Sequence, residues 1–544
     1  MRFRPAVGII ALSIMGICAP RAQVHQWSFS FGDMDFEGAR SVAVDPDGNI
    51  VIAGTFEGSI NFGGGWLTSM GANDIYLAKL APDGSHIWSR SFGDADIDVA
   101  GGLDIDALGY ICLTGYFLNT INFGAGPMIS AGSTDIFVAK FHPGGACLWS
   151  RSFGDAALQA GRDVAAGDGG SVILTGYFTG TVDFGGGILT SNGEYDVFLA
   201  RFDSSSGFHM WSASYGDAAD QIPAAVAAHP QGRILLTGIT AGTIDFGAGP
   251  LASAGGYDVF LAKFESFGAH IWSRIYGDAE DDFASTVGFV PFSEEGIMAG
   301  HFHGGIDLGG GSLISAGSLD VFVSRFDSHG AHQWSSCFGD ADDALVRGLG
   351  VNPGGDVALT GHFGGTIDFG GGPLASAGGQ DVFLATFDGT GAHEWSLRAG
   401  DGGEQFGRDV AFDDPGDLLA VGDFENVIDF GGGPLVSFGG RDVFLAKLRP
   451  SMASVGREPA AEFAGLRVWP HPTGSEATLG YAIPHAGHVR LTMHDLEGRR
   501  TGVLVNGWRR AGRHEIGWQG ETGRAFLRLE LDGRRIAARS TVAR

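Results

Sequence analysis

The chain has 544 residues, of which 93 are glycine and 18% are charged, and its formal net charge is −28. This acidic balance excludes a general nucleic-acid binder, because phosphates need a basic footprint. Dense clusters of Val, Ile, Leu and Phe between the glycines exclude a disordered Gly-rich chain.

The first 22 residues have the layout of a secretory signal peptide. Arg2 and Arg4 precede an apolar stretch at 6–17, which is followed by small residues. This stretch is too short to span a bilayer, and no later segment has about 18 consecutive apolar residues. We therefore expect residues 1–22 to be removed, no further membrane span, and a protein that is secreted or held at the cell surface.

Seven tryptophans recur at steps of 61 or 62 residues. They are Trp27, Trp88, Trp149, Trp211, Trp272, Trp334 and Trp395. A period of this size indicates a repeat architecture, in which each unit needs its neighbours to cover its apolar faces.

Each repeat predicts four antiparallel strands, which is the composition of one propeller blade. In the first repeat the predicted strands are residues 41–44, 50–56, 74–80 and 86–92. Residues 45–49, Asp-Pro-Asp-Gly-Asn, predict a turn, and the Gly-rich segment from residue 60 predicts a hairpin inserted between the second and third strands.

The third-strand aspartate and the Trp strand both occur seven times, but the series of Trp strands begins one repeat earlier. The aspartates are Asp74, Asp135, Asp196, Asp258, Asp320, Asp381 and Asp442. One Trp strand precedes the first repeat, and none follows residue 448. We therefore expect a closed seven-bladed β-propeller over residues 23–449, in which residues 25–31 pair with residues 442–448 and complete the last blade.

The repeat resembles a known family. Residues 163–178 and 258–264 show its pattern, which ends in Thr-Gly-Tyr-Phe and Asp-Val-Phe-Leu-Ala-Lys-Phe, respectively. This pattern resembles the SBBP β-propeller repeat of bacterial surface and secreted proteins. The resemblance implies an extracellular propeller whose ligand is undetermined, and it carries over no catalytic residues.

The tail predicts a separate small β-domain. Residues 450–465 have the composition of a linker, and short alternating strands over residues 466–544 predict an Ig-like β-sandwich, so the whole chain is predicted to be all-β. Residues 495–499 and 512–518 resemble the C-terminal sorting domain of the type IX secretion system or the related FlgD-like Ig module. His471 departs from the Asn usual in sorting domains. The resemblance implies contact with the secretion machinery, and a plain Ig-like module is the alternative.

Four repeats carry an arginine just before the innermost strand. These residues are Arg40, Arg162, Arg347 and Arg408. They predict a partial ring near the mouth of the central channel, where it would bind an anionic ligand. Pairing with Asp163, Asp409 or the turn carboxylates is the more usual role of such arginines.

The turn after each Trp strand, which is Phe/Tyr-Gly-Asp in most copies, is acid-rich in several repeats. Closely spaced carboxylates suit calcium, which is the one cofactor that the sequence offers. The candidate ligands are Asp94, Asp96, Asp98, Asp278, Asp281, Asp282, Asp340 and Asp342. The first Asp of the turn is present in all seven copies, which favours an Asx-type hydrogen bond over a metal site.

Six of the seven tryptophans have a histidine two residues before them. A ring of imidazoles would suit zinc or copper. If the Trp strand is the outermost one, however, these side chains are spread around a rim, and we expect them to pack there.

No catalytic motif stands out in the chain. The even spacing of the repeats leaves no room for a special insertion in one blade. We therefore expect a non-enzymatic scaffold that binds an extracellular protein or glycan through the face carrying the hairpins and acid-rich turns. The alternatives are a carbohydrate-active enzyme, a lyase or glycosidase, on the same scaffold, and end-to-end assembly of the propeller as envelope structure.

Overall fold

In the computed structural model, residues 23–450 fold as a series of four-stranded antiparallel sheets, each corresponding to one sequence repeat. The structure describes these residues apart from 292 and 415, and in the tail the segments that form strands β43 to β49. The predicted signal peptide and residues 451–465 of the predicted linker lie outside the described residues. The chain divides into two compact units, residues 1–452 and 453–544.

Seven four-stranded sheets lie in the described part of residues 23–450, and we number them 1 to 7 in chain order. Within each sheet the strands pair first to second, second to third and third to fourth. The first strands are β2 (Glu37–Val44), β8 (Asp98–Ile105), β14 (Gln159–Ala166), β20 (Gln221–Ala228), β26 (Asp282–Phe289), β32 (Ala344–Val351) and β38 (Gln405–Phe412). The second strands are β3 (Ile50–Phe56), β9 (Ile111–Phe117), β15 (Val172–Phe178), β21 (Arg233–Thr240), β27 (Gly296–Phe302), β33 (Val357–Phe363) and β39 (Leu418–Phe424).

The third and fourth strands follow the same scheme. The third strands are β6 (Asp74–Leu80), β12 (Asp135–Phe141), β18 (Asp196–Phe202), β24 (Asp258–Glu265), β30 (Asp320–Phe326), β36 (Asp381–Phe387) and β42 (Asp442–Pro450). The fourth strands are β7 (His86–Phe92), β13 (Cys147–Phe153), β19 (His209–Tyr215), β25 (His270–Tyr276), β31 (His332–Phe338), β37 (His393–Ala399) and, in sheet 7, β1 (Gln23–Phe31). One 3-10 turn is present among the described residues, η1 (Asp168–Gly170), and it connects β14 to β15.

The predicted hairpin between the second and third strands is present in every sheet. The pairs are β4 (Ser59–Ile60) with β5 (Leu67–Thr68), β10 (Thr120–Ile121) with β11 (Met128–Ile129), β16 (Thr181–Asp183) with β17 (Ile188–Thr190), β22 (Thr243–Ile244) with β23 (Leu251–Ala252), β28 (Gly305–Asp307) with β29 (Ser312–Ile314), β34 (Thr366–Ile367) with β35 (Leu374–Ala375), and β40 (Val427–Ile428) with β41 (Leu435–Val436). The Asp33 carboxylate accepts the backbone N–H of Ser59 at 2.7 Å, so hairpin and acid-rich turn share one face, the turn face.

The third strands are buried over most of their length because a neighbouring sheet covers each of their faces. Every residue of β6 and of β12 is buried. The lysines on these strands are paired with acids of the turn after the first strand, Lys79 with Asp45 at 2.7 Å and Lys140 with Asp106 at 3.0 Å. These ion pairs satisfy charges that would otherwise be costly to bury.

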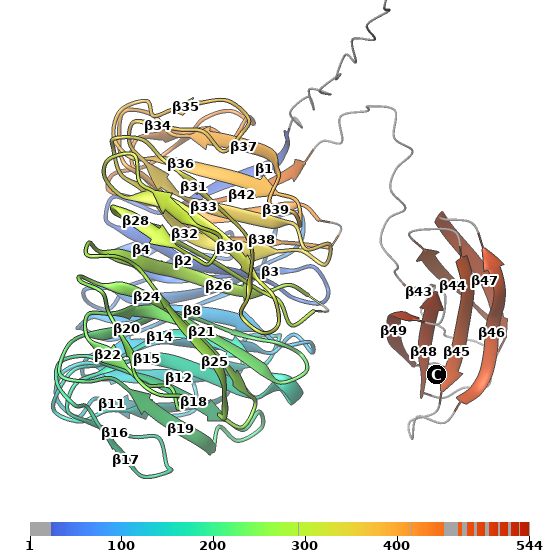
Figure 1. Cartoon of the computed structure of the whole chain (residues 1–544), viewed down its shortest axis with the longest axis horizontal. Helices are drawn as coiled ribbons and strands as arrows, with labels where there is room; N and C mark the ends of the chain where they lie inside the picture. The colour runs from blue at the N-terminus through green and yellow to red at the C-terminus, as the bar shows by residue number, and fades with distance from the viewer. Residues whose placement is uncertain are drawn as a thin grey trace, which may run out of the picture. The chain divides into compact units, whose positions relative to one another are not determined.

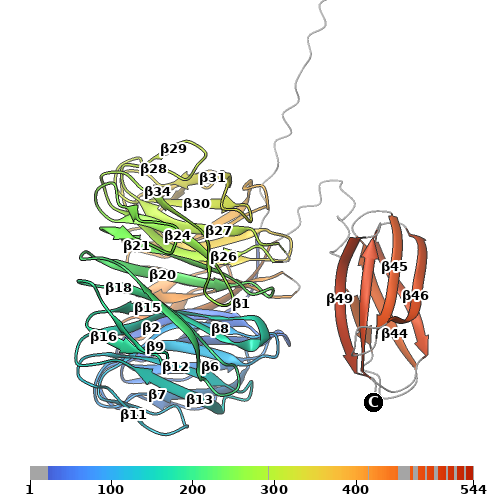
Figure 2. The same cartoon turned by 60° about the horizontal axis from the view of Figure 1, so that its bottom comes forward.

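The first strands lie next to one another in chain order. β2 contacts β8, and the series continues through β14, β20, β26 and β32 to β38, which contacts β2 again. Figures 1 and 2 show the blue strands of sheet 1 close to the orange strands of sheet 7. The fold is therefore an all-β, propeller-like arrangement of repeated sheets.

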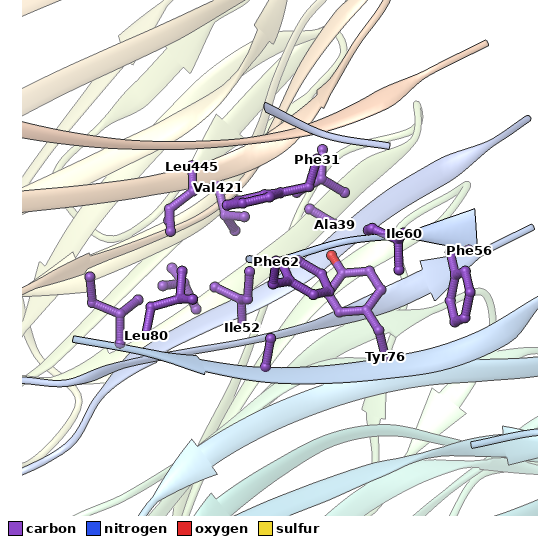
Figure 3. Close-up of a cluster of buried hydrophobic side chains, with 14 of the residues drawn as sticks. Phe31, Ala39, Ile52, Phe56, Ile60, Phe62, Tyr76, Leu80, Val421 and Leu445 are labelled. Atoms are coloured by element: carbon purple, nitrogen blue, oxygen red, sulfur yellow. The ribbon is translucent and has the colours of Figure 1, made fainter. Parts of the chain in front are cut away.

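The first and last repeats are joined by the N-terminal strand. β1 pairs antiparallel with β42, with Phe31 opposite Val443, as the displaced Trp strand predicts. Phe31 and Leu445 of sheet 7 belong to one buried cluster with Phe62 and Tyr76 of the first repeat (Figure 3). The ring centroids of Phe31 and Phe62 are 4.9 Å apart.

Six of the seven recurring tryptophans connect their sheet to the next, whereas the buried indole N–H of Trp395 has no hydrogen-bond partner in the described part of the chain. The Trp88 indole N–H donates to the carbonyl of Pro143, in the turn between the third and fourth strands of sheet 2, at 3.1 Å. The same bond is made by Trp27, Trp149, Trp211, Trp272 and Trp334 to the carbonyls of Pro82, Ser204, Ser266, Ser328 and Gly389. The tryptophans are therefore structural.

The six histidines also have a packing role, as expected. In each case Nε2 lies 3.0 or 3.1 Å from the hydroxyl oxygen of the serine three residues on. A glycine of the hairpin covers the ring in five of the six cases, as Gly64 covers His86, and Ala248 has the equivalent place in the hairpin before His270. The histidines occupy six separate fourth strands and do not converge on one point.

The tail has two antiparallel sheets in its described segments. One has the order β43–β44–β47 and the other β46–β45–β48–β49. The strands are β43 (Leu466–Trp469), β44 (Glu476–Ile483), β45 (Gly487–His494), β46 (Arg500–Arg509), β47 (Gly512–Gln519), β48 (Arg524–Leu531) and β49 (Arg534–Val542). Residues 495–499 and His471, on which the sorting-domain resemblance depends in part, lie outside the described residues. No helix in the described chain has the length and apolar character needed to cross a bilayer.

Gly391→Ala tests the packing between sheets. Gly391 has φ +83°, and an added Cβ would lie 2.8 Å from Cδ2 of Trp334. Gly48→Ala is the matched control, because Gly48 has φ +82° but its Cβ would meet only Cγ of Pro82, at 3.7 Å. Both variants carry the cost of a positive φ, and only Gly391→Ala displaces an indole.

We expect Gly391→Ala to lower the free energy of unfolding by about 1–3 kcal/mol more than Gly48→Ala does. Urea denaturation followed by tryptophan fluorescence measures the difference. Equal losses in the two variants would show that the Trp–turn contact does not hold neighbouring sheets together.

Candidate functional site

Every first strand carries a β-bulge at its fourth residue. In β2 the pairing register with β3 shifts between Ala39 and Ser41, which leaves Arg40 without a partner residue. The same shift recurs in the other six first strands. The bulged residues are Arg40, Gly101, Arg162, Ala224, Ser285, Arg347 and Arg408. A bulge re-aims a side chain away from the ladder, and all seven bulged residues line one cavity.

This central cavity has a volume of about 490 Å³ and is enclosed by the first strands. The structure therefore brings together the four arginines that the sequence singles out. The sequence pattern places these arginines just before the first strands. In the structure they lie within those strands, three residues after each begins, because the strands start earlier than predicted. β2, for example, begins at Glu37 and not at Ser41.

Arg408 is the one arginine of the four with a carboxylate partner among the described residues. Its Nε and Nη2 donate to the two carboxylate oxygens of Asp423 at 2.6 and 3.1 Å. Asp423 lies on the second strand of the same sheet and is fully buried. The expected pairing of these arginines with Asp163, Asp409 or the turn carboxylates is not what the structure shows.

Arg40, Arg162 and Arg347 have no carboxylate within 4.0 Å in the described part of the chain. Arg40 donates from Nε to the carbonyl of Gly101 at 2.6 Å, and the buried Nε of Arg162 has no hydrogen-bond partner. Arg347 is exposed to the cavity. Three guanidinium groups are thus available to a ligand.

The positive charges of the arginines lower one another's pKa values. Burial, and then the charges of Arg162 and Arg408, lower the pKa of Arg40 to about 9. Desolvation, and then the charges of Arg408 and Arg162, lower the pKa of Arg347 to about 10. Like charges confined at low dielectric favour binding of a negative group.

Three cavity-lining aspartates join neighbouring first strands. Oδ2 of Asp163 accepts the backbone N–H of Val226 at 2.8 Å, and Oδ2 of Asp104 accepts that of Ala166 at 2.8 Å. Across the joint between sheets 7 and 1, Oδ2 of Asp409 accepts the N–H of Val42 at 3.0 Å. Desolvation raises the pKa of Asp163 to about 7 and the pKa values of Asp104 and Asp409 to about 6.

Two buried histidines near Arg347, His301 and His362, were not predicted as site residues from the sequence. His301 Nδ1 lies 3.3 Å from the hydroxyl of the bulged Ser285. His362 is 6% exposed, and its Nδ1 has no hydrogen-bond partner. Burial, and then the charge of Arg347, lower their pKa values to about 3 and about 2, so both rings are neutral. The signal that would have found them is a departure from Thr-Gly-Tyr-Phe at the tyrosine position of the repeat.

The acid-rich turns use their carboxylates within the turn. In all seven turns the first aspartate accepts the backbone N–H two residues on, which confirms the Asx-type bond. The second oxygens of Asp94, Asp278 and Asp340 accept a hairpin N–H at 3.0, 2.8 and 2.7 Å.

The remaining candidate calcium ligands also make hydrogen bonds within or next to their own turns. Asp98 and Asp282 accept the N–H of Asp94 and Asp278, and Asp281 accepts that of Tyr257. Asp96 accepts the side chain of Asn119, and Asp342 donates its N–H to Asp340. Among the described residues, no three His, Cys, Asp or Glu side chains are grouped so as to hold a metal ion. Calcium binding by these turns stays a prediction.

Comparison with known proteins gives distant likenesses. No protein-family model matches the chain. A protein of Acanthamoeba polyphaga mimivirus, described as an uncharacterized WD repeat-containing protein, is 25% identical over 186 residues. That match covers 30% of this chain and 13% of the viral protein, so the chain spans about an eighth of its relative's length.

Two solved structures are similar over most of the chain. Quinohemoprotein alcohol dehydrogenase from Comamonas testosteroni is 10% identical, with a TM-score of 0.38 over 81% of this chain and 78% of its own. Acylaminoacyl peptidase from Pyrococcus horikoshii is 11% identical, with a TM-score of 0.38 over 83% of this chain and 59% of its own.

One position of the repeat carries a carboxylate in some sheets and an amide in others. The first residue of the first strand is Glu37, Asp98 or Asp282 in sheets 1, 2 and 5, and Gln159, Gln221 or Gln405 in sheets 3, 4 and 7. Each glutamine Nε2 donates to the first aspartate of the turn, at 2.6, 2.8 and 2.9 Å. In sheet 1, Oε2 of Glu37 accepts the N–H of Asp33 at 3.2 Å, and Oε1 is buried without a partner. A carboxyl group can replace the amide as donor only while it holds a proton.

Glu37→Gln should therefore remove a pH-dependent loss of stability. Burial, with the Asp33 and Asp442 carboxylates adding to it, raises the pKa of Glu37 in the folded chain from 4.5 to about 9. Its contribution to stability is full below pH 4.5 and is lost as pH rises toward 9. We expect Glu37→Gln to be more stable than the parent at pH 9 by more than about 1 kcal/mol.

Gln159→Glu is the reverse variant and should introduce the same alkaline loss in sheet 3. Denaturant unfolding from pH 5 to pH 9 measures both variants. Profiles that run parallel to the parent's would show that Glu37 holds no proton in the folded chain.

Proposed function

We propose that residues 23–450 form a closed seven-bladed β-propeller of the SBBP type that binds an anionic group of an extracellular protein or glycan in its central cavity. The return of β38 to β2 and the pairing of β1 with β42 support the closed ring. The observation that carries the binding function is the cluster of three arginines without carboxylate partners on one cavity of about 490 Å³. Burying guanidinium groups without an acid costs free energy that an anion would recover.

The cellular setting is part of the same proposal. The signal-like N-terminus and the tail, which has two antiparallel sheets, support export of the chain and its display at the cell surface, with the tail as an Ig-like sorting module. Hairpins of nearly equal length in all seven sheets support a binding scaffold over the lyase or glycosidase alternative, because an active site on such a scaffold would need a distinctive loop.

Arg347→Ala tests the binding site. Arg347 is exposed and has no ion pair, so its loss should leave folding intact. We expect sulfate, used as a simple anion, to bind about tenfold more weakly to Arg347→Ala by isothermal titration calorimetry, because one charge-assisted contact is lost. Arg274→Ala, on the exposed surface of β25, is the control and should bind sulfate as the parent does. Equal affinity of all three proteins would refute the cavity as the anion site.

Anion affinity should also rise as pH falls. The folded-state pKa values of Asp163, Asp104 and Asp409 are raised to about 7, 6 and 6, so these side chains lose their negative charge between pH 8 and pH 5. The arginines keep their charge across this range. Sulfate stays doubly ionised, and we expect it to bind several-fold more tightly at pH 5 than at pH 8. Affinity that is independent of pH would contradict this electrostatic description of the cavity.

A further inference from the structure

The charge around the central cavity is asymmetric. Arg347, Arg408 and Arg40 stand on the consecutive sheets 6, 7 and 1, and Arg162 stands on sheet 3. The bulged residues of sheets 4 and 5 are Ala224 and Ser285, which are small. The guanidinium groups therefore leave space beside sheets 4 and 5, where the rest of a ligand can lie.

The size of that space exceeds what a simple ion needs. Pockets for small organic ligands are about 300–1,000 Å³, and this cavity has about 490 Å³. The wall on sheets 4 and 5 is made largely of small side chains, among them Ala224, Ala225, Ala227, Ala228 and Ala284. A ring-sized group fits beside the anionic group.

The cavity also presents acceptors that a simple anion cannot use. Asp104, Asp163 and Asp409 line it together with the arginines. Each carboxylate uses lone pairs on backbone N–H groups, and each has capacity for further donors. Carboxylates repel sulfate, phosphate and acidic peptide side chains, whereas hydroxyl groups donate to them.

Uncharged hydrogen-bonding groups complete the wall. Ser41, Ser285 and Thr286 contribute hydroxyls to the cavity. The hydroxyl of Ser285 is in turn hydrogen-bonded to Nδ1 of His301. Burial and the charge of Arg347 lower the pKa of His301, so its ring is neutral. A neutral imidazole and a hydroxyl can each donate or accept, which suits alcohol groups better than a second charge.

We infer that the ligand is a carboxylated sugar, a uronic acid residue of an acidic glycan, whose carboxylate meets Arg40, Arg162 and Arg347 and whose hydroxyls meet Asp163, Asp409 and the serines. This inference rests on the proposed anion-binding function and makes it specific. One anionic group together with several hydroxyl donors is the combination that both halves of the cavity accept. An acidic peptide brings a carboxylate without these donors.

The test compares four probes on the full chain by isothermal titration calorimetry. They are trigalacturonate, the neutral trisaccharide galactotriose, a triglutamate peptide and sulfate. We expect trigalacturonate to bind at least tenfold more tightly than each of the others. If triglutamate or sulfate binds as tightly as trigalacturonate, the sugar inference is overturned and anion binding stands. If galactotriose binds as tightly, the carboxylate has no part in recognition, and if no probe binds, the proposed function fails as well.

Two variants separate recognition of hydroxyls from recognition of charge. Asp163→Asn keeps the shape of the side chain and removes its charge, and Ser285→Ala removes one hydroxyl without touching an arginine. We expect both to reduce the preference for trigalacturonate over sulfate by at least threefold, while Asp163→Asn binds sulfate more tightly than the parent. Melting temperatures confirm that each variant is folded. An unchanged preference in Ser285→Ala and Asp163→Asn would overturn the inference.

Discussion

The pairing of β1 with β42 is the contact on which the rest of the first unit depends. It completes sheet 7 with residues from the opposite end of the unit and so covers a sheet edge that would otherwise be open to other chains. The third strands are apolar on both faces, and each needs a sheet on either side. Without β1, the aromatic cluster of Phe31, Phe62 and Tyr76 would lose one wall (Figure 3). The joint between sheets 7 and 1 is therefore built as densely as any other.

The repeats act as natural variants of one another. At the bulged position, arginine stands in four sheets and glycine, alanine or serine in three, with the backbone irregularity unchanged. The bulge thus belongs to the scaffold, and the residue placed on it is free to serve binding. At the start of the first strand, three sheets carry glutamine, three carry a carboxylic acid and sheet 6 carries Ala344, and each glutamine donates to the turn aspartate.

Sequence was sufficient for the elements with a strong local signal. The second, third and fourth strands of the first repeat, its inserted hairpin and the partner of the N-terminal strand were all predictable, because β-branched and aromatic runs alternate with Gly-rich turns. The early start of the first strands was missed, since Glu37, Gly38 and Ala39 have no strand preference and are ordered by their neighbours. Four arginines at one repeat position could be seen in the sequence. Their common bulge and the choice of Asp423 as partner of Arg408 could not, because both arise from contacts across strands.

The position of the arginines has a consequence for when the cavity exists at all. Arg408 and Arg40 stand on either side of the joint between sheets 7 and 1, and Asp409 bonds to Val42 across it. These residues are separated by most of the unit in sequence and meet only after the last strand has been synthesised and has captured the first. The proposed ligand site is therefore incomplete in any partly folded chain, and it is complete only once the sheets at the two ends of the unit have met.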